Sequence, residues 1–169
     1  LRLRLFRAGA VLKENEDYEV VPVIGDGALL SGMALEALNN IGYNKKKVII
    51  VFNDNDMSIA ENYGGLYQNL KLLRESNGEA ECNLFKAMGL DYLYLNEGND
   101  IEKLIGILTK VKDIDHPIVV HINTQKGKGY SFAEENKEQW HWCMPFDEKT
   151  GKSTVETIYT VLHAGGKFG

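Results

Sequence analysis

Hydrophobic and polar positions alternate in blocks along the first third of the chain. A strand pattern at residues 18–24, apolar from residue 20, leads into a Gly-Asp-Gly turn at 25–27, and helical periodicity follows over 28–40. A second apolar run at 48–52 ends in Asn-Asp-Asn at 53–55. Strand, glycine turn, helix and strand in this order predict a βαβ unit. The first strand is expected to form mainly after its proline, which cannot donate to a ladder.

The same two periods continue downstream. Strand patterns occupy residues 91–95 and 118–123, and helical patterns occupy 66–74 and 79–88, the last closed by Gly89 as a C-cap. A further helix, capped by one of two residues at 99–100, carries its apolar residues on one face: Ile101, Leu104, Ile105 and Leu108. Strands that alternate with helices predict an α/β fold, a doubly wound and mostly parallel sheet of about five strands flanked by helices.

The remaining segments are less regular. Residues 1–15 fit either a strand or a helix from about Leu5, and we favour the helix. The polar, aromatic stretch 132–151 predicts an extended surface segment. Ser153 begins a capped helical pattern that runs to Leu162. We expect one domain over residues 1–152, followed by a C-terminal helix and tail over 153–169.

Two polar side chains close the first two predicted strands. Asp26 follows the first strand and Asn55 follows the second. Because ligands collect outside the carboxyl ends of parallel strands, these side chains are expected to converge. Carboxylate and amide oxygens suit Mg²⁺ or Ca²⁺ better than zinc. Gly27 and Ala28 open the helix, where small residues let a phosphate reach backbone N–H groups and the positive end of the helix dipole. The stretch therefore predicts a magnesium diphosphate site.

A Gly-Asp-Gly turn alone would also suit a plain βαβ crossover. The pairing with Asn-Asp-Asn decides between the two interpretations, since Asp26 and Asn55 lie 29 positions apart and each closes a β-like run. This spacing is typical of thiamine diphosphate enzymes. The stretch GDGALLSGMALEALNNIGYNKKKVIIVFNDNDMSI resembles the 1-deoxy-D-xylulose-5-phosphate synthase family more closely than it resembles transketolases or pyruvate decarboxylases.

The resemblance implies a ligand set at this site. Asp26 and Asn55 would bind Mg²⁺ through their side chains, and Met57 would bind it through its backbone carbonyl. Gly27 and Ala28, with Asn55, would contact the diphosphate. The implied cofactors are thiamine diphosphate and Mg²⁺.

A second resemblance covers residues 124–151. The segment TQKGKGY closes the last predicted strand and fits either a functional loop or a simple basic turn. The family carries TxKGxGY there, which implies that Tyr130 holds the cofactor and Lys126 adds positive charge near phosphate. A lone histidine between two tryptophans is often a packing residue, but the family places a histidine at the position of His141. This implies proton transfer or substrate positioning. The FDxxTG motif at 146–151 also matches.

The sequence departs from the family pattern at three places. The Gly-His-Ser motif and the ligand histidine expected upstream are not found in residues 1–15, and the GPVDGH-like loop has lost its histidine at 96–99. The family's long insertion is reduced to a few residues near 74–79. The mid-strand His121 is interpreted as a packed sheet residue rather than a ligand.

Charge, cysteine content and hydrophobicity argue against a nucleic-acid-binding, a disulfide-rich or a membrane protein. The net charge is −5, and the Lys45–Lys47 run is interpreted as a solvated loop rather than a nucleic-acid patch, since nothing basic or aromatic extends it. Cys82 and Cys143 lack disulfide or metal-ligand spacing, which favours a reducing compartment. No apolar run approaches the roughly 20 residues of a membrane span, and no signal-peptide pattern is present. A cytoplasmic location with neither membrane nor nucleic-acid partners is expected.

The resemblance implies a thiamine diphosphate-dependent transferase that joins pyruvate to glyceraldehyde 3-phosphate, forming 1-deoxyxylulose 5-phosphate and CO₂, for isoprenoid and thiamine biosynthesis. A pyrimidine-binding domain in the same or another chain would complete the site, usually in a homodimer, so the isolated chain is expected to have little or no turnover. The first residue is Leu rather than Met, which suggests a fragment. Two alternatives stay open: the diphosphate-binding subunit of a split transketolase-like enzyme, and a non-catalytic remnant of the fold.

Overall fold

The computed structural model describes residues 21–57 and 64–155, and its centre is a parallel β-sheet. The strands are β1 (Val23–Gly25), β2 (Val48–Asp54), β3 (Asp91–Leu95) and β4 (Pro117–Asn123), in the order β1-β2-β4-β3. The helices are α2 (Asp26–Leu29), α3 (Gly32–Asn44), α4 (Gly65–Glu75), α5 (Leu84–Ala87), α6 (Ile101–Val111) and α7 (Ser131–Glu135). The predicted α/β class with a parallel sheet is confirmed, with four strands in the described residues.

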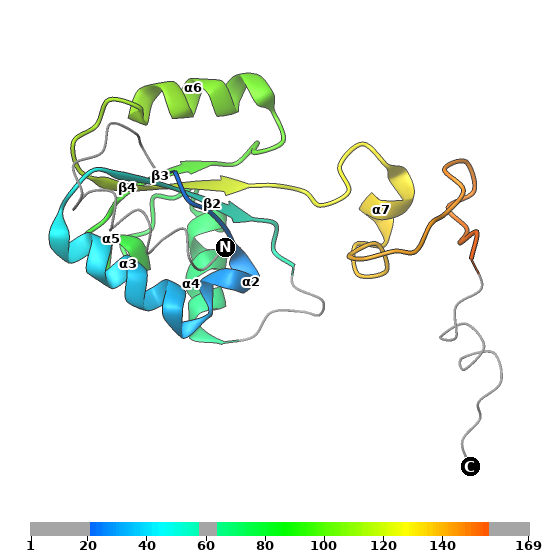
Figure 1. Cartoon of the computed structure of the whole chain (residues 1–169), viewed down its shortest axis with the longest axis horizontal. Helices are drawn as coiled ribbons and strands as arrows, with labels where there is room; N and C mark the ends of the chain where they lie inside the picture. The colour runs from blue at the N-terminus through cyan, green and yellow to red at the C-terminus, as the bar shows by residue number, and fades with distance from the viewer. Residues whose placement is uncertain (1–20, 58–63, 156–169) are drawn as a thin grey trace, which may run out of the picture. The chain divides into compact units, whose positions relative to one another are not determined.

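Two apolar clusters lie on opposite faces of the sheet, because successive strand residues point to opposite sides. Phe52 of β2 packs with α3, α4 and α5, whereas Ile49 of the same strand packs with α6. Figure 1 shows α6 on one side of the sheet and α3, α4 and α5 on the other. Burial of each large apolar side chain contributes about 1.5–3 kcal/mol. Both faces are therefore covered, as in a doubly wound sheet.

The first strand and helix differ in detail from their predictions. β1 begins after Pro22, whose carbonyl accepts the Val51 N–H at 2.9 Å, while residues 18–20 lie outside the described residues. The single helix predicted over 28–40 is wrong, because Ser31 interrupts it. The Ser31 backbone is extended, with ψ 135°, and its hydroxyl donates to the Ala28 carbonyl at 2.9 Å. A side chain that bonds its own backbone competes with helix formation.

The helix that follows α4 is shorter than predicted. The expected helix over 79–88 is wrong, since α5 begins only at Leu84, where the Asn83 side chain accepts the N–H groups of Phe85 and Lys86. Gly89, with φ 83°, closes α5 as expected. α4 ends in a similar way, because the Asn77 and Gly78 N–H groups return to carbonyls of its last turn.

The face that α6 buries differs from the predicted one. Ile107 and Val111 are buried with Leu104 packed beside them, whereas Ile101, Ile105 and Leu108 are exposed. The helix is apolar around a wide arc, so periodicity alone did not indicate which part of that arc meets the sheet. The predicted cap is confirmed for Asp100, which accepts the N–H groups of Glu102 and Lys103.

The described residues fall into two compact units, one ending at Gln125 and the other beginning at Lys126, which we describe separately. The second unit contains α7, so the extended segment predicted over 132–151 is wrong at its start. Ser153 forms an isolated antiparallel bridge with Phe146 instead of opening a helix, and residues 156–162 of that prediction lie outside the described part. The domain predicted over 1–152 stays a prediction. The helix predicted from about Leu5 also stays a prediction, because residues 1–15 lie outside the described part of the chain.

No helix in residues 21–57 and 64–155 combines the length and apolar character that a membrane crossing requires.

Candidate functional site at the strand tips

Asp26 lies at the junction of β1 and α2, with its carboxyl group largely buried. It is 4% exposed, and its Oδ1 accepts the N–H of Gly27 at 2.8 Å. Its Oδ2 accepts the N–H of Met57 at 3.1 Å, across 31 positions of sequence. The carboxylate therefore faces the segment that follows β2.

The same Met57 N–H also donates to the Asn55 side chain. Asn55 Oδ1 lies 3.0 Å from this nitrogen. A carboxylate oxygen of Asp26 and an amide oxygen of Asn55 thus converge on one atom. The structure brings together Asp26, Asn55 and the Met57 backbone; whether they bind a metal, and whether the Met57 carbonyl takes part, stays a prediction.

The environment of Asp26 makes its negative charge costly. Burial raises the pKa of the Asp26 carboxyl, the nearby Asp54 charge raises it further, and the N–H groups of Gly27 and Met57 offset part of the increase. The net pKa lies above the ordinary value. A cation beside this carboxylate would relieve that cost.

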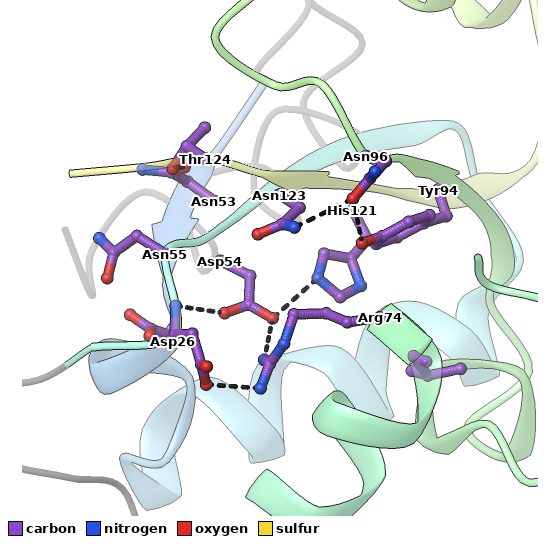
Figure 2. Close-up of polar contacts among 12 residues, drawn as sticks. Asp26, Asn53, Asp54, Asn55, Arg74, Tyr94, Asn96, His121, Asn123 and Thr124 are labelled. Atoms are coloured by element: carbon purple, nitrogen blue, oxygen red, sulfur yellow. Dashed lines mark hydrogen bonds and ion pairs between the residues drawn. The ribbon is translucent and has the colours of Figure 1, made fainter. Parts of the chain in front are cut away.

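Asp54, the last residue of β2, forms a second polar centre that the sequence analysis did not single out. Its side chain is fully buried and accepts from Arg74 Nη1 of α4 at 2.7 Å and from His121 Nε2 of β4 at 3.0 Å. Burial alone would raise the pKa of Asp54, but the His121 hydrogen bond and the Arg74 charge outweigh it, so the pKa is lowered. Figure 2 shows both partners pointing at this carboxylate.

His121 is fully buried, which confirms its interpretation as a packed sheet residue. Its ring lies 4.7 Å from that of Phe52 and 5.0 Å from that of Tyr94, centroid to centroid. Burial lowers its pKa despite the Asp54 charge, so the neutral ring donates from Nε2 to Asp54. Nδ1 then accepts the Tyr92 hydroxyl at 2.7 Å. Every polar atom of this ring has a partner.

A strand argument could have found Asp54. Residues 48, 50 and 52 point to the face of the sheet that α3, α4 and α5 cover, and two-residue alternation places residue 54 on the same side. A buried carboxylate requires a cationic or hydrogen-bonding partner. The sequence gives no comparable signal for Arg74, because that contact joins a helix and a strand tip across 20 positions.

The other predicted site residues, Lys126, Tyr130 and His141, belong to the second unit. Lys126 Nζ lies 3.0 Å from His141 Nδ1. An ammonium group has only donors, so the ring accepts at Nδ1 and carries its proton on Nε2. The structure brings these two residues together within their unit.

Tyr130 packs in an aromatic cluster of the second unit. Its ring lies 5.2 Å from Trp140, 5.5 Å from Phe132 and 5.6 Å from Phe146, and its hydroxyl donates to the Glu148 carbonyl at 3.2 Å. Desolvation raises the pKa of Tyr130, and the charges of nearby carboxylates add to this. The hydroxyl is therefore a hydrogen-bond donor at neutral pH.

The FDxxTG motif builds a tight turn beside this cluster. Asp147 Oδ1 accepts the backbone N–H groups of Lys149 and Thr150 and the Thr150 hydroxyl. Gly151 has φ 68°, and a Cβ there would meet the Phe132 ring at 3.0 Å. The turn geometry and its packing therefore account for Asp147 and Gly151 of the motif.

A parallel sheet with helices on both faces places the described residues in the α/β class, and solved structures show which fold within that class it is. The transketolase from Campylobacter jejuni superposes with a TM-score of 0.60 at 24% identity, over 79% of this chain and 20% of that one. The transketolase from Leishmania mexicana gives 0.50 at 21% identity, over 73% and 18%. The fold is therefore shared with transketolases.

The chain belongs to the 1-deoxy-D-xylulose-5-phosphate synthase family, whose model matches residues 6–83 and 76–124. It is similar to the synthase of Clostridium acetobutylicum, 39% identical over 196 residues, covering 95% of this chain and 31% of that protein. The synthase of Listeria monocytogenes serotype 4b is 42% identical over 154 residues, covering 85% and 25%. The chain thus spans about a third or less of these relatives. The two matched segments overlap at 76–83, beside residues 74–79, where the family's insertion was predicted to be reduced to a few residues.

Proposed function

We propose that this chain is the diphosphate- and metal-binding part of a thiamine diphosphate-dependent synthase that makes 1-deoxyxylulose 5-phosphate. The observation that carries the proposal is the convergence of the Asp26 and Asn55 oxygens on the Met57 N–H. Membership of the synthase family supports the same conclusion. Asp26, Asn55 and the Met57 carbonyl would hold Mg²⁺, and Gly27 and Ala28 would contact the diphosphate.

The residues present fit a hard divalent cation. The donors are one carboxylate and one amide oxygen, and Mg²⁺ completes such partial sets with phosphate oxygens and water. In residues 21–57 and 64–155 no three His, Cys, Asp or Glu side chains gather as a metal site. A soft-metal site is therefore a poorer fit there. Arg74 pairs with Asp54 and Asp56, whereas the Asp54 charge raises the pKa of the nearby Asp26 carboxyl, so a cation beside Asp26 would balance negative charge there.

The cofactor, when bound, supplies the carbanion chemistry, and the protein supplies binding and orientation. Tyr130 would hold the cofactor as part of its aromatic cluster. His141, with its proton on Nε2, would donate a proton or orient the substrate, and its contact with Lys126 supports that tautomer. Lys126 would thus fix the tautomer of His141, in addition to placing positive charge near phosphate.

The proposed reaction joins pyruvate and glyceraldehyde 3-phosphate with release of CO₂. A pyrimidine-binding domain, in the same or another chain, and a homodimeric assembly would complete the site, for a cytoplasmic enzyme of isoprenoid and thiamine biosynthesis. We therefore expect little turnover from these 169 residues alone.

Calorimetric titration of the chain with Mg²⁺ and thiamine diphosphate tests the proposal. Wild type is expected to bind, and Asp26→Ala is expected to weaken binding by about tenfold or more. Asp113→Ala is the matched control, because its side chain is 86% exposed and pairs only with its neighbour Lys112 among the contacts found. Undetectable binding to both wild type and Asp26→Ala would point instead to a non-catalytic remnant of the fold.

A further inference from the structure

A guanidinium group ties the tip of β2 to the turn that follows it. Arg74, in the last turn of α4, donates from Nη1 to Asp54 Oδ2 at 2.7 Å and from Nη2 to Asp56 Oδ1. Asp54 Oδ1 in turn accepts the Asp56 N–H at 3.0 Å. Arg74, Asp54 and Asp56 thus form a closed set of hydrogen bonds, which we call the Arg74 bridge.

The Arg74 bridge spans a residue with an uncommon backbone conformation. Asp56 has φ 57°, in the left-handed region that residues other than glycine rarely adopt. Asp56 separates Asn55 from Met57, so its conformation decides where the Asn55 amide oxygen and the Met57 N–H lie. The Met57 N–H donates to the Asn55 amide oxygen at 3.0 Å. Strained residues persist where surrounding structure over-determines them.

One arm of the bridge, the Arg74–Asp54 pair, is shielded from solvent. The Asp54 side chain is fully buried and the Arg74 side chain is 13% exposed, whereas the Asp56 side chain is 62% exposed. The planar guanidinium donates to two carboxylates at once, which an ammonium group on a flexible stem cannot reproduce in the same geometry. No contact joins Arg74 directly to Asp26 or Asn55 among the hydrogen bonds and ion pairs of the described residues.

We propose that Arg74 is a positioning residue that fixes the 54–57 turn in the geometry that receives the cation, acting through Asp54 and Asp56. The inference rests on the proposed function for the identity of the ligand. It assigns a role to a residue outside the Gly-Asp-Gly and Asn-Asp-Asn motifs. It also gives Asp54 and Asp56 a shared purpose, which is to hold Asn55 and Met57 toward Asp26.

Two variants test the bridge in the 169-residue chain. Arg74→Lys keeps the charge but loses the double contact, and Asp56→Asn weakens only the exposed arm while leaving the buried Arg74–Asp54 pair. Each is expected to weaken binding of Mg²⁺ with thiamine diphosphate by about tenfold in calorimetry. Lys71→Met is the matched control, because Lys71 lies one turn earlier on α4 and its side chain is 67% exposed. It should bind as wild type does.

A second measurement needs no ligand. Hydrogen exchange of the Met57 amide should quicken by about tenfold in Asp56→Asn and Arg74→Lys, while amides in β4 keep their wild-type rates. A purely structural role would raise exchange throughout the sheet. Wild-type affinity together with unchanged Met57 exchange in both variants would overturn the inference. Absence of binding in wild type would overturn the proposed function, and the exchange measurement would still decide whether the bridge holds the turn.

Discussion

Two histidines at opposite ends of β4 form the same kind of pair in opposite surroundings. His116 precedes the strand, and its Nε2 lies 2.7 Å from Asp91 Oδ2 with the side chain 43% exposed. His121 lies within the strand, and its Nε2 is 3.0 Å from Asp54 Oδ2 with both side chains fully buried. Distance alone would rank the exposed pair as the stronger one.

The surroundings reverse the effect on the imidazole. A hydrogen bond to Asp115, with the charge of Asp91, raises the pKa of His116. Burial lowers the pKa of His121, although Asp54 acts in the other direction. At the carboxyl ends of the strands, His121 is therefore neutral inside a buried hydrogen-bond network. At the amino ends, His116 is exposed to solvent and has a raised pKa. A carboxylate partner does not by itself make a histidine cationic.

The largest expected effect comes from removing the centre of the buried pair. Asp54→Ala leaves Arg74 and His121 without their shared acceptor, and breaking a buried pair in this way costs about 3–5 kcal/mol of unfolding free energy. Urea denaturation followed by circular dichroism would measure it. Asp91→Ala is the control and should change stability far less, since its pair is exposed. Equal losses in the two variants would remove the distinction between the ends.

A smaller effect is expected from the outer member of the buried network. Tyr92→Phe removes the hydroxyl that donates to His121 Nδ1 and leaves that acceptor unpaired, at a cost of about 1–2 kcal/mol. Tyr94→Phe is the matched control, because the Tyr94 hydroxyl contacts the exposed Asn96 at a longer 3.3 Å. The same denaturation experiment applies. A greater loss in the control would contradict the network.

Titration of both imidazoles would examine the comparison directly. NMR of histidine side chains between pH 5 and 9 should give a midpoint above the reference value of 6.5 for His116 and below it for His121. The chain has four histidines, so His116→Gln identifies the signal of His116 and His121→Gln that of His121. Midpoints on the same side of the reference value would show that burial does not separate the two sites.

The smallest expected effect is the pH dependence that His116 gives to stability. Its folded pKa is raised, so its contribution is fully present below the unfolded value of about 6.5 and is lost as pH rises through the folded pKa. His116→Gln should therefore lower the melting temperature slightly at pH 5.5 and leave it unchanged at pH 9. A difference that grows with pH would have the wrong sign.

The sequence predicted the parts of the fold that depend on local pattern. The buried strands β2 and β4 follow from continuous apolar runs, and the meeting of Asp26 and Asn55 follows from the rule that parallel strand ends share one edge. The break at Ser31 was not predictable from apolar spacing, which continues across it.

Other features depend on packing between distant segments. Nothing local indicates that α6 turns Ile107 rather than Ile105 toward the sheet, because both positions are apolar. In the sequence, Arg74 is an ordinary cation at the end of a helix. Its pairing with Asp54 depends on the packing of α4 against the tip of β2. The roles of Lys126, Tyr130 and His141 came from family resemblance, and the structure adds the contacts within their own unit.

The turn that closes α4 has a consequence for how this chain relates to longer members of its family. Asn77 and Gly78, with φ 54° and 83°, end the helix by bonding back to it, and Leu73 and Phe85 anchor the two flanking helices in one apolar cluster. Each flank is therefore secured without help from the connection. A long segment can be gained or lost at this point in evolution while the sheet stays intact, and the same point is a natural junction for chimeric proteins.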